Sequence, residues 1–408
     1  MPRPLLDDSY APEVRANVGL LAFARFAGNT VYRFAAPFLA TIAAGLGVSL
    51  GRLGVALAIG ELVTLSAPLI GRVVDAAPRR AAMVTGLTIV AVGATVTGTA
   101  QALPQFVVGL CLLSLGKVGY DISLGAWIAD RVPWERRSRV IGLTEIAWSA
   151  SLLLGVSLLG ALLALTSWHV AYVTGAVIVL LAAVSVLRHL PHEPARHAHH
   201  AASASSARRA AWPVVVTTCL SMALLACSSQ FLFVTYGSWL DDHFGFSAGG
   251  IAVVTFGLGV LELVAGVVSV GRTDRWGKER CVLIGTSVMA PAAVLVVLGS
   301  AHLWLLLPAF GVFLMGFELA IISGMPLGAL LTPGKPATGL AILIGSVTCG
   351  RALTSIPATA WLESHGLRWP ATGAVLAAVA AHLAMRLRHA VAQPSVTKPR
   401  LAEVTRPA

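Results

Sequence analysis

The sequence predicts an all-α polytopic membrane protein with twelve transmembrane helices in two six-helix bundles related by pseudo-two-fold symmetry. Of its 408 residues, 57% are hydrophobic and only 12% are charged, and the mean hydropathy is +0.81. A soluble domain carries about 25% charged residues, so this chain lacks the polar surface of a water-exposed globule. Long uncharged runs and a similarity between the two halves of the chain are the other observations that predict this fold.

The uncharged runs are too long for a single membrane crossing each. A helix needs about 20 apolar residues to cross a bilayer, whereas the segments 81–116, 146–187 and 281–317 contain no Asp, Glu, Lys or Arg. The runs are continuous rather than alternating, which indicates helices and not barrel strands. The predicted spans are 18–42, 53–71, 82–101, 104–128, 140–164, 169–187, 213–239, 250–270, 281–299, 303–328, 339–362 and 369–386.

Lys and Arg gather in every second connection, whereas the remaining connections contain only Arg52 and Arg368. Basic residues favour the cytoplasmic side, so we expect a multi-pass plasma-membrane protein with both termini in the cytoplasm. The net charge of +11 then lies along one membrane face, which predicts contact with the lipid bilayer and not with nucleic acid. We expect a monomer. The expected parts are an N-terminal bundle (1–188), a cytoplasmic linker (189–212), a C-terminal bundle (213–388) and a cytoplasmic tail (389–408).

The two halves of the chain resemble each other at an offset of about 200 residues. Residues 61–63 and 262–264 both read Glu-Leu-Val, and residues 124–126 and 327–329 both read Leu-Gly-Ala. The segment Leu-Gly-Val-Ser at 46–49 is likewise similar to Phe-Gly-Phe-Ser at 244–247. Parallel repeats of six spans joined by a polar linker are typical of a two-bundle transporter.

A charged motif follows the second span of each half. It comprises Gly71, Asp75, Arg79 and Arg80 in the first half and Asp274, Arg275, Gly277 and Lys278 in the second. On these residues the chain resembles the major facilitator superfamily, whose motif there is Gly-x-x-x-Asp-Arg-x-Gly-Arg/Lys. The first copy departs from it, with Ala76 in place of Arg and Pro78 in place of Gly. Within that superfamily the chain looks most similar to bacterial drug or sugar efflux permeases. The resemblance implies that the motif is a cytoplasmic latch between the bundles.

Nine ionisable side chains fall inside the predicted spans. They are Arg25, Arg33, Glu61, Lys117, Asp121, Glu145, Glu262, Glu318 and Arg351. A charged group at the centre of an inserted helix costs roughly 2.5–3.5 kcal/mol, so nine uncompensated charges would exceed a typical folding stability of about 5–15 kcal/mol. These side chains must therefore face partners or water.

Arg25, Asn29 and Arg33 are spaced to share one face of the first span. They form either a substrate or coupling face or a structural tie to Asp121 or Glu318. Lys117 and Asp121 are four residues apart, which suits either a local ion pair or a proton site at Asp121.

Glu318 has no basic neighbour three or four residues away, so it needs a partner from another helix or a proton. In the superfamily, spans one, four, seven and ten line a central cavity. The resemblance therefore implies a substrate and proton cavity lined by Arg25, Asn29, Arg33, Lys117, Asp121 and Glu318. Glu61, Glu262 and Arg351 would lie on flanking helices. Glu145 is expected to join the network of cytoplasmic loops.

The chain has no Gly-x-x-x-x-Gly-Lys-Ser/Thr loop for nucleotides and no set of metal ligands. We therefore expect a secondary transporter and not an enzyme. It would need no cofactor and draw on a proton gradient to export a small organic molecule by alternating access. Uptake of an organic anion or a sugar, favoured by Arg25, Arg33 and Arg351, is the alternative form of transport. A non-transporting membrane sensor on the same scaffold is the alternative of another class.

Overall fold

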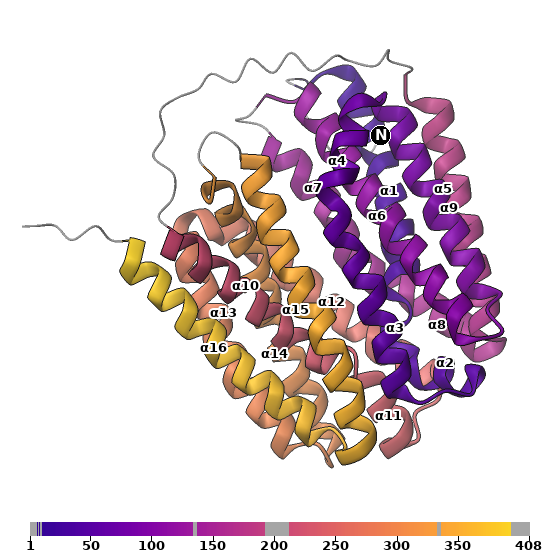
Figure 1. The fold of residues 1–408 in the computed structure, drawn as a ribbon, viewed down its shortest axis with the longest axis vertical. Helices are drawn as coiled ribbons and strands as arrows, with labels where there is room; N and C mark the ends of the chain where they lie inside the picture. The colour runs from indigo at the N-terminus through magenta and orange to yellow at the C-terminus, as the bar shows by residue number, and fades with distance from the viewer. Residues whose placement is uncertain are drawn as a thin grey trace, which may run out of the picture.

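The structure is a computed structural model that describes Leu6, Asp8 and residues 10–133, 137–191, 212–332 and 336–392. Within these ranges the chain is helical and contains no β-strand. Figure 1 shows two groups of helices side by side, the first half of the chain in indigo to magenta and the second half in rose to yellow. Most of the predicted linker and tail lies outside the described residues.

The first group of helices forms the N-terminal bundle, in which several predicted spans consist of more than one helical segment. Its elements are α1 (Pro12–Arg33), η1 (Ala36–Phe38), α2 (Leu39–Leu46), α3 (Leu50–Leu62), η2 (Val63–Ser66), α4 (Ala67–Ala76), α5 (Arg79–Gly98), α6 (Leu103–Arg131), α7 (Arg137–Ala150), η4 (Ser151–Val156), α8 (Ser157–Leu165) and α9 (Trp168–His189).

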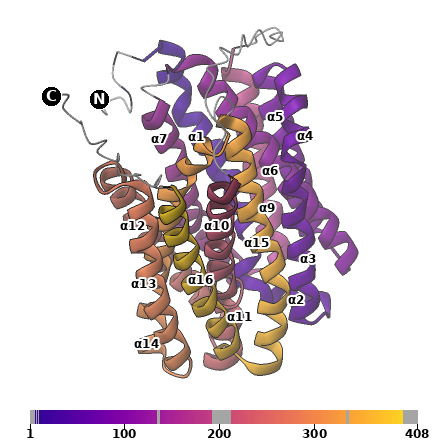
Figure 2. The ribbon, with the colours of Figure 1, turned by 60° about the vertical axis from the view of Figure 1, so that its left-hand side comes forward.

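The second group forms the C-terminal bundle. Its elements are α10 (Trp212–Phe233), α11 (Tyr236–Phe244), α12 (Ala248–Trp276), α13 (Lys278–Leu298), α14 (Leu303–Gly324), η5 (Met325–Leu330), α15 (Pro336–His365) and α16 (Arg368–Ala392). α1 begins and α16 ends at the same end of the molecule, whereas α2 and α11 lie at the opposite end (Figures 1 and 2). This arrangement agrees with an even number of crossings.

Eleven helical stretches among the described residues are long and apolar enough to cross a membrane, from Leu50–Val74 to Arg368–Val391. They coincide, within a few residues at most boundaries, with the second to twelfth predicted spans. The first predicted span, 18–42, is instead divided among α1, η1 and α2. α1 carries Arg15, Arg25 and Arg33, so its hydropathy alone does not mark it as a membrane helix.

The internal repeat predicts a local structure that both bundles contain. Gly47 ends α2 and Gly245 ends α11, and both adopt the left-handed conformation, with φ of 63° and 67°, which suits glycine at a helix C-terminus. Two residues later, Ser49 and Ser247 cap the next helix, because each hydroxyl accepts a hydrogen bond from the backbone of its first turn. The paired sequences at 46–49 and 244–247 therefore encode the same turn.

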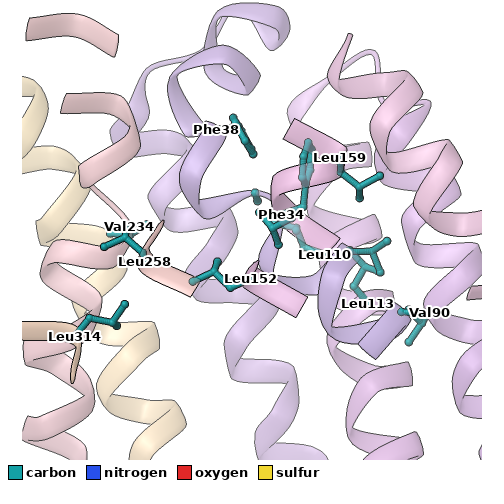
Figure 3. Packing of buried hydrophobic residues seen from close by; sticks show 14 of the residues in the cluster. Phe34, Phe38, Val90, Leu110, Leu113, Leu152, Leu159, Val234, Leu258 and Leu314 are labelled. Carbon is teal, nitrogen blue, oxygen red and sulfur yellow. The ribbon is translucent and has the colours of Figure 1, made fainter. Parts of the chain in front are cut away.

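Glycines allow close packing of neighbouring helices in each bundle. A Cβ atom on Gly86 of α5 would lie 2.7 Å from the backbone nitrogen of Tyr120 on α6. A Cβ atom on Gly285 of α13 would likewise clash with the carbonyl oxygen of Gly316 on α14. Small residues at such contacts are the usual way in which membrane helices associate. Leu152, in the N-terminal bundle, lies on the side of its helix that faces Leu258 and Val234 of the C-terminal bundle (Figure 3).

The two bundles come into close contact toward the end that carries α2 and α11. A Cβ atom on Gly237 of α11 would collide with the carbonyl oxygen of Pro37 in η1, and one on Gly54 of α3 would come within 2.7 Å of the carbonyl oxygen of Ser355 on α15. Such contacts bring the backbones of the two bundles together at two places. A cavity of about 480 Å³ lies at the same end and is lined by residues of both bundles, among them Ser49, Trp239 and Glu363.

Candidate functional site

An ionic cluster joins three helices of the N-terminal bundle. Arg25 on α1 donates from Nε to Oδ1 of Asp121 on α6 at 3.1 Å, and from Nη1 to Oε1 of Glu145 on α7 at 2.7 Å. Lys117, one helical turn before Asp121, donates from Nζ to its Oδ2 at 2.6 Å. Two basic groups thus face two carboxylates. The Glu145 side chain keeps 53% of its surface accessible, so this cluster is open on one side.

A second ion pair crosses between the bundles. Arg33, at the end of α1, donates from Nη1 and Nη2 to the two carboxylate oxygens of Glu262 on α12, at 3.0 and 2.9 Å. Nη1 also donates to the carbonyl oxygen of Trp148 at 2.8 Å. The Arg33 side chain is 5% accessible and that of Glu262 is inaccessible. A bidentate arginine–carboxylate contact without water is a strong and directional link, and here it ties α1 to the opposite bundle.

Glu318 on α14 is the carboxyl group next to this pair. It is buried, and it lies against Glu262 and within electrostatic range of Arg33. One guanidinium group is therefore surrounded by two carboxyl groups, both supplied by the C-terminal bundle. Glu318, which was predicted to need a partner from another helix or a proton, thus has both Arg33 and Glu262 as neighbours from other helices.

A third ion pair crosses between the bundles in the opposite sense. Here the carboxylate, Glu61 on α3, comes from the N-terminal bundle, and Arg351 on α15 donates to its Oε1 at 2.7 Å. Tyr32 on α1 also interacts with Glu61. Glu61 and Glu262 occupy matching positions of the internal repeat. The repeat therefore provides each bundle with one acidic side chain that binds an arginine of the other.

The aromatic ring of Trp148 lies close to a basic group of each of the first two clusters. The guanidinium carbon of Arg33 is 4.2 Å from the centre of this ring, and Nζ of Lys117 is 5.4 Å from it. Nζ of Lys117 is also 5.3 Å from the ring of Tyr32. These distances lie in the range of cation–π attraction. Lys117 therefore has two aromatic neighbours in addition to its carboxylate.

The backbone near Trp148 is irregular. α7 ends at Ala150 and is followed by η4, a π-helix over Ser151–Val156. A π-helical turn disturbs the regular hydrogen-bond ladder and occurs frequently at functional sites. Here the carbonyl oxygen of Trp148 accepts hydrogen bonds from Arg33 and from the hydroxyl of Ser151. The irregular turn thus gives Arg33 a backbone acceptor in addition to its carboxylates.

Asn29 lies between Arg25 and Arg33 on α1 and is 1% accessible. Neither its side-chain nitrogen nor its side-chain oxygen has a hydrogen-bond partner among the described residues. A buried amide without partners costs about 1–3 kcal/mol, so a bound water or ligand would stabilise it. The predicted face formed by Arg25, Asn29 and Arg33 therefore contains one polar side chain that is not engaged.

The sequence profile of the Major Facilitator Superfamily matches residues 18–331. The chain belongs to this superfamily. It is 25% identical over 346 residues to the uncharacterized MFS-type transporter YwfA of Bacillus subtilis (strain 168), covering 80% of this chain and 82% of that protein. It is 24% identical over 277 residues to multidrug resistance protein 1 of the same organism, covering 67% of this chain and 70% of that protein.

Solved structures of transporters share the fold. A bacterial homolog of the human lysosomal transporter Spinster, in an inward-facing and unoccupied conformation, superposes with a TM-score of 0.77 at 13% identity, covering 94% of this chain and 99% of the other. A mutant of the nucleoside transporter NupG gives a TM-score of 0.71 at 14% identity, covering 92% of this chain and 100% of the other. The predicted fold, two bundles of a major facilitator protein, is confirmed. The chain is a multi-pass membrane protein.

The structure brings the predicted cavity residues together with those expected to flank them. Arg25 binds Asp121, which was one of its two expected partners, whereas Arg33 binds Glu262. Glu145 was expected in the network of cytoplasmic loops but binds Arg25. No role for Trp148 was predicted from the sequence. Its position three residues after Glu145 places both on one helical face, which is the signal that could have found it.

The motif after the second span is only partly described. The side chains of Asp75 and Asp274 lie outside the described residues. Arg79 donates to Asp130 at 3.0 Å and to the carbonyl oxygen of Val74 at 2.8 Å, both within its own bundle. Arg80 donates to the carbonyl oxygen of Leu190. A Cβ atom on Gly71 or Gly277 would meet open space. Arg275 and Lys278 are exposed. The latch between the bundles therefore stays a prediction.

Proposed function

We propose that this protein is a monomeric secondary active transporter that moves a small organic solute by alternating access, in exchange for protons, in the direction of export. The observation that carries the proposal is a charge count. Of the nine ionisable side chains assigned to the predicted spans, four are basic and five are carboxyl groups. Three clusters are balanced: Arg25 and Lys117 with Asp121 and Glu145, Arg33 with Glu262, and Arg351 with Glu61. Glu318 is the fifth carboxyl group.

A proton supplies the missing positive charge. An isolated carboxylate is very unfavourable in a low-dielectric interior, and such a group neutralises instead. Two carboxyl groups that share one site cannot both ionise easily, and Glu318 lies against Glu262. In the described conformation Glu318 therefore carries a proton, and Arg33 is left with Glu262 as its charged partner.

Loss of that proton changes the contact between the bundles. A deprotonated Glu318 competes with Glu262 for Arg33, which is the guanidinium group that ties α1 to α12. The Arg33–Glu262 ion pair, which favours the present conformation, is then no longer the only favourable pairing of Arg33. A ligand or proton shifts a conformational equilibrium only through a difference in affinity between its states, and this competition provides such a difference.

Export is supported by the similarity to multidrug resistance protein 1. The alternative of anion uptake relied on free arginines, but Arg25, Arg33 and Arg351 each bind a carboxylate. An anionic substrate would have to displace a carboxylate from each of them. A non-transporting sensor would bind solutes without moving them, which the same experiment tests.

Purified protein in liposomes with an imposed pH gradient provides the test. We expect the gradient to drive accumulation of a fluorescent organic cation such as ethidium, and the Glu318→Gln variant to lose gradient-driven accumulation while it still exchanges ethidium across the membrane. Asp241→Asn, on α11 away from the three clusters, is the matched control and should behave as the wild type. Equal accumulation with and without the gradient would refute proton coupling. No movement of ethidium or of any other solute in a broad panel would favour a sensor.

A further inference from the structure

Lys117 occupies an arrangement that is typical of a binding site for an external cation. Its ammonium group lies 5.3 Å from the ring of Tyr32 on α1 and 5.4 Å from the ring of Trp148 on α7. Asp121 accepts its only described hydrogen bond, at 2.6 Å. Two aromatic faces and a carboxylate around one ammonium group are the elements with which proteins recognise alkylammonium ligands. We call Tyr32, Trp148 and Asp121 the ammonium box.

We propose that the Lys117 ammonium group is a built-in placeholder for the cationic group of the transported solute, which is an organic ammonium compound that displaces Lys117 from the ammonium box. The inference names a substrate class and so rests on the proposed function. The contacts that carry it are independent of the proton on Glu318.

The box is built from three different helices, and Asp121 has a second basic partner besides Lys117. Arg25 already binds Asp121 at 3.1 Å, so the carboxylate keeps one basic partner when Lys117 leaves. The side chains of Lys117 and Asp121 are 15% and 26% accessible, and Tyr32 and Trp148 are only partly buried. Each side chain around the ammonium group therefore keeps part of its surface accessible.

The charge count favours a cation over an anion. The basic side chains of the three clusters are all bound to carboxylates. When Glu318 has lost its proton, the five carboxylates exceed the four basic groups by one negative charge. A monovalent cation restores neutrality in the same way as the proton did. The solute and the proton then compensate the same excess negative charge in turn, which is the condition for their exchange.

The placeholder lowers the apparent affinity for a solute. A ligand whose site is available for only a fraction of the time binds more weakly by that fraction. If Lys117 fills the box for nine-tenths of the time or more, its removal strengthens binding about tenfold or more. Replacement by arginine keeps a tethered cation and should give no such gain.

Equilibrium binding of radiolabelled tetraethylammonium to the purified full-length protein in detergent tests the proposal. We expect Lys117→Gln to bind it at least tenfold more tightly than the wild type, and Lys117→Arg to show no gain. In the Lys117→Gln background, Trp148→Leu should remove most of the gain, because the extra negative charge alone does not replace the aromatic face. Tetraethylmethane, which is uncharged and of the same shape, should not compete. Equal affinity in the wild type and Lys117→Gln, or an unchanged gain with Trp148→Leu, would overturn the proposal.

A second measurement uses the wild-type protein and needs no folded variant. The chain contains only the lysines Lys117, Lys278, Lys335 and Lys398, so acetylation of each can be followed by mass spectrometry. Tetraethylammonium should release Lys117 and increase its acetylation severalfold, with no change at the exposed Lys278. Unchanged acetylation of Lys117 at saturating tetraethylammonium would contradict displacement. If these results hold while a pH gradient drives no transport, the placeholder stands and the proposed function fails. Gradient-driven transport without an effect of Lys117 refutes only the placeholder.

Discussion

Removal of the carboxyl groups around Arg33 should reveal that Glu262 and Glu318 replace each other. The Arg33–Glu262 pair is bidentate and almost fully inaccessible to water. Loss of one partner of a buried pair typically costs about 3–5 kcal/mol, because the other charge stays buried without compensation. In Glu262→Gln, however, Glu318 remains beside Arg33 and can give up its proton to become the partner. Each single glutamine variant therefore leaves one carboxyl group for Arg33.

We expect the double variant Glu262→Gln/Glu318→Gln to lose about 3–5 kcal/mol of unfolding free energy. This loss should exceed the sum of the two single losses by about 1–3 kcal/mol, which is the range of coupling energies for residues in one network. Glu318→Gln alone should have a small effect, since the amide replaces a protonated carboxyl group. The measurement is chemical unfolding of the purified variants in mixed micelles.

A second cycle serves as the control. Glu61 lies in a separate ion pair with Arg351, so the losses for Glu61→Gln and Glu318→Gln should add within about 0.5 kcal/mol. If the losses for Glu262→Gln and Glu318→Gln also add within that limit, the two carboxyl groups do not share Arg33. The proposed role of Glu318 would then be wrong.

Three further experiments test the contacts between the bundles and the unpaired amide. Gly237→Ala introduces a Cβ atom that collides with the carbonyl oxygen of Pro37, so the distance between spin labels on α2 and α11 should increase. Asn29→Leu removes a buried amide without partners among the described residues. The substitution should raise the unfolding free energy by about 1–3 kcal/mol and should decrease solute transport in liposomes. Glu61→Arg should abolish transport by placing two cations together, and Arg351→Glu in the same chain should restore part of it.

A specific result would contradict each of these three predictions. Gly257→Ala, at a helical position with open space around it, is the control for Gly237→Ala and should leave the spin-label distance unchanged. A shift of equal size in both variants would show that steric contact is not the cause. A loss of stability in Asn29→Leu would mean that the amide has a bound partner in the native protein. Failure of the charge exchange to recover any activity would assign Glu61 a role beyond its ion pair.

Much of the architecture could be predicted from the sequence because lipid imposes simple rules on the chain. Uncharged runs of a given length, together with alternation of basic connections, are sufficient to place the spans. The turns at Gly47 and Gly245 follow from a repeat that can be read directly. The division of the first predicted span into α1, η1 and α2 was not predictable from hydropathy, because residues 34–42 continue the apolar run without a charged residue.

The candidate site was predictable in its members but not in its pairing. Any charged residue inside a span must find a partner, so composition alone identifies Arg33, Glu262 and Glu318. Which of them touch depends on the angle between bundles and on the rotation of each helix, and neither is encoded in local spacing. The role of Trp148 depends further on the π-helical turn that follows it, and residues 151–156 give no periodic signal for such a turn.

The central claim is that one proton resides on Glu318 in the described conformation. Infrared difference spectroscopy of the purified protein, recorded between high and low pH, detects the carbonyl band of a protonated carboxyl group directly. We expect one such band from the protein interior, which is absent in Glu318→Gln and retained in Glu61→Gln. A band that persists unchanged in Glu318→Gln would contradict the account, because the proton would then reside on another group.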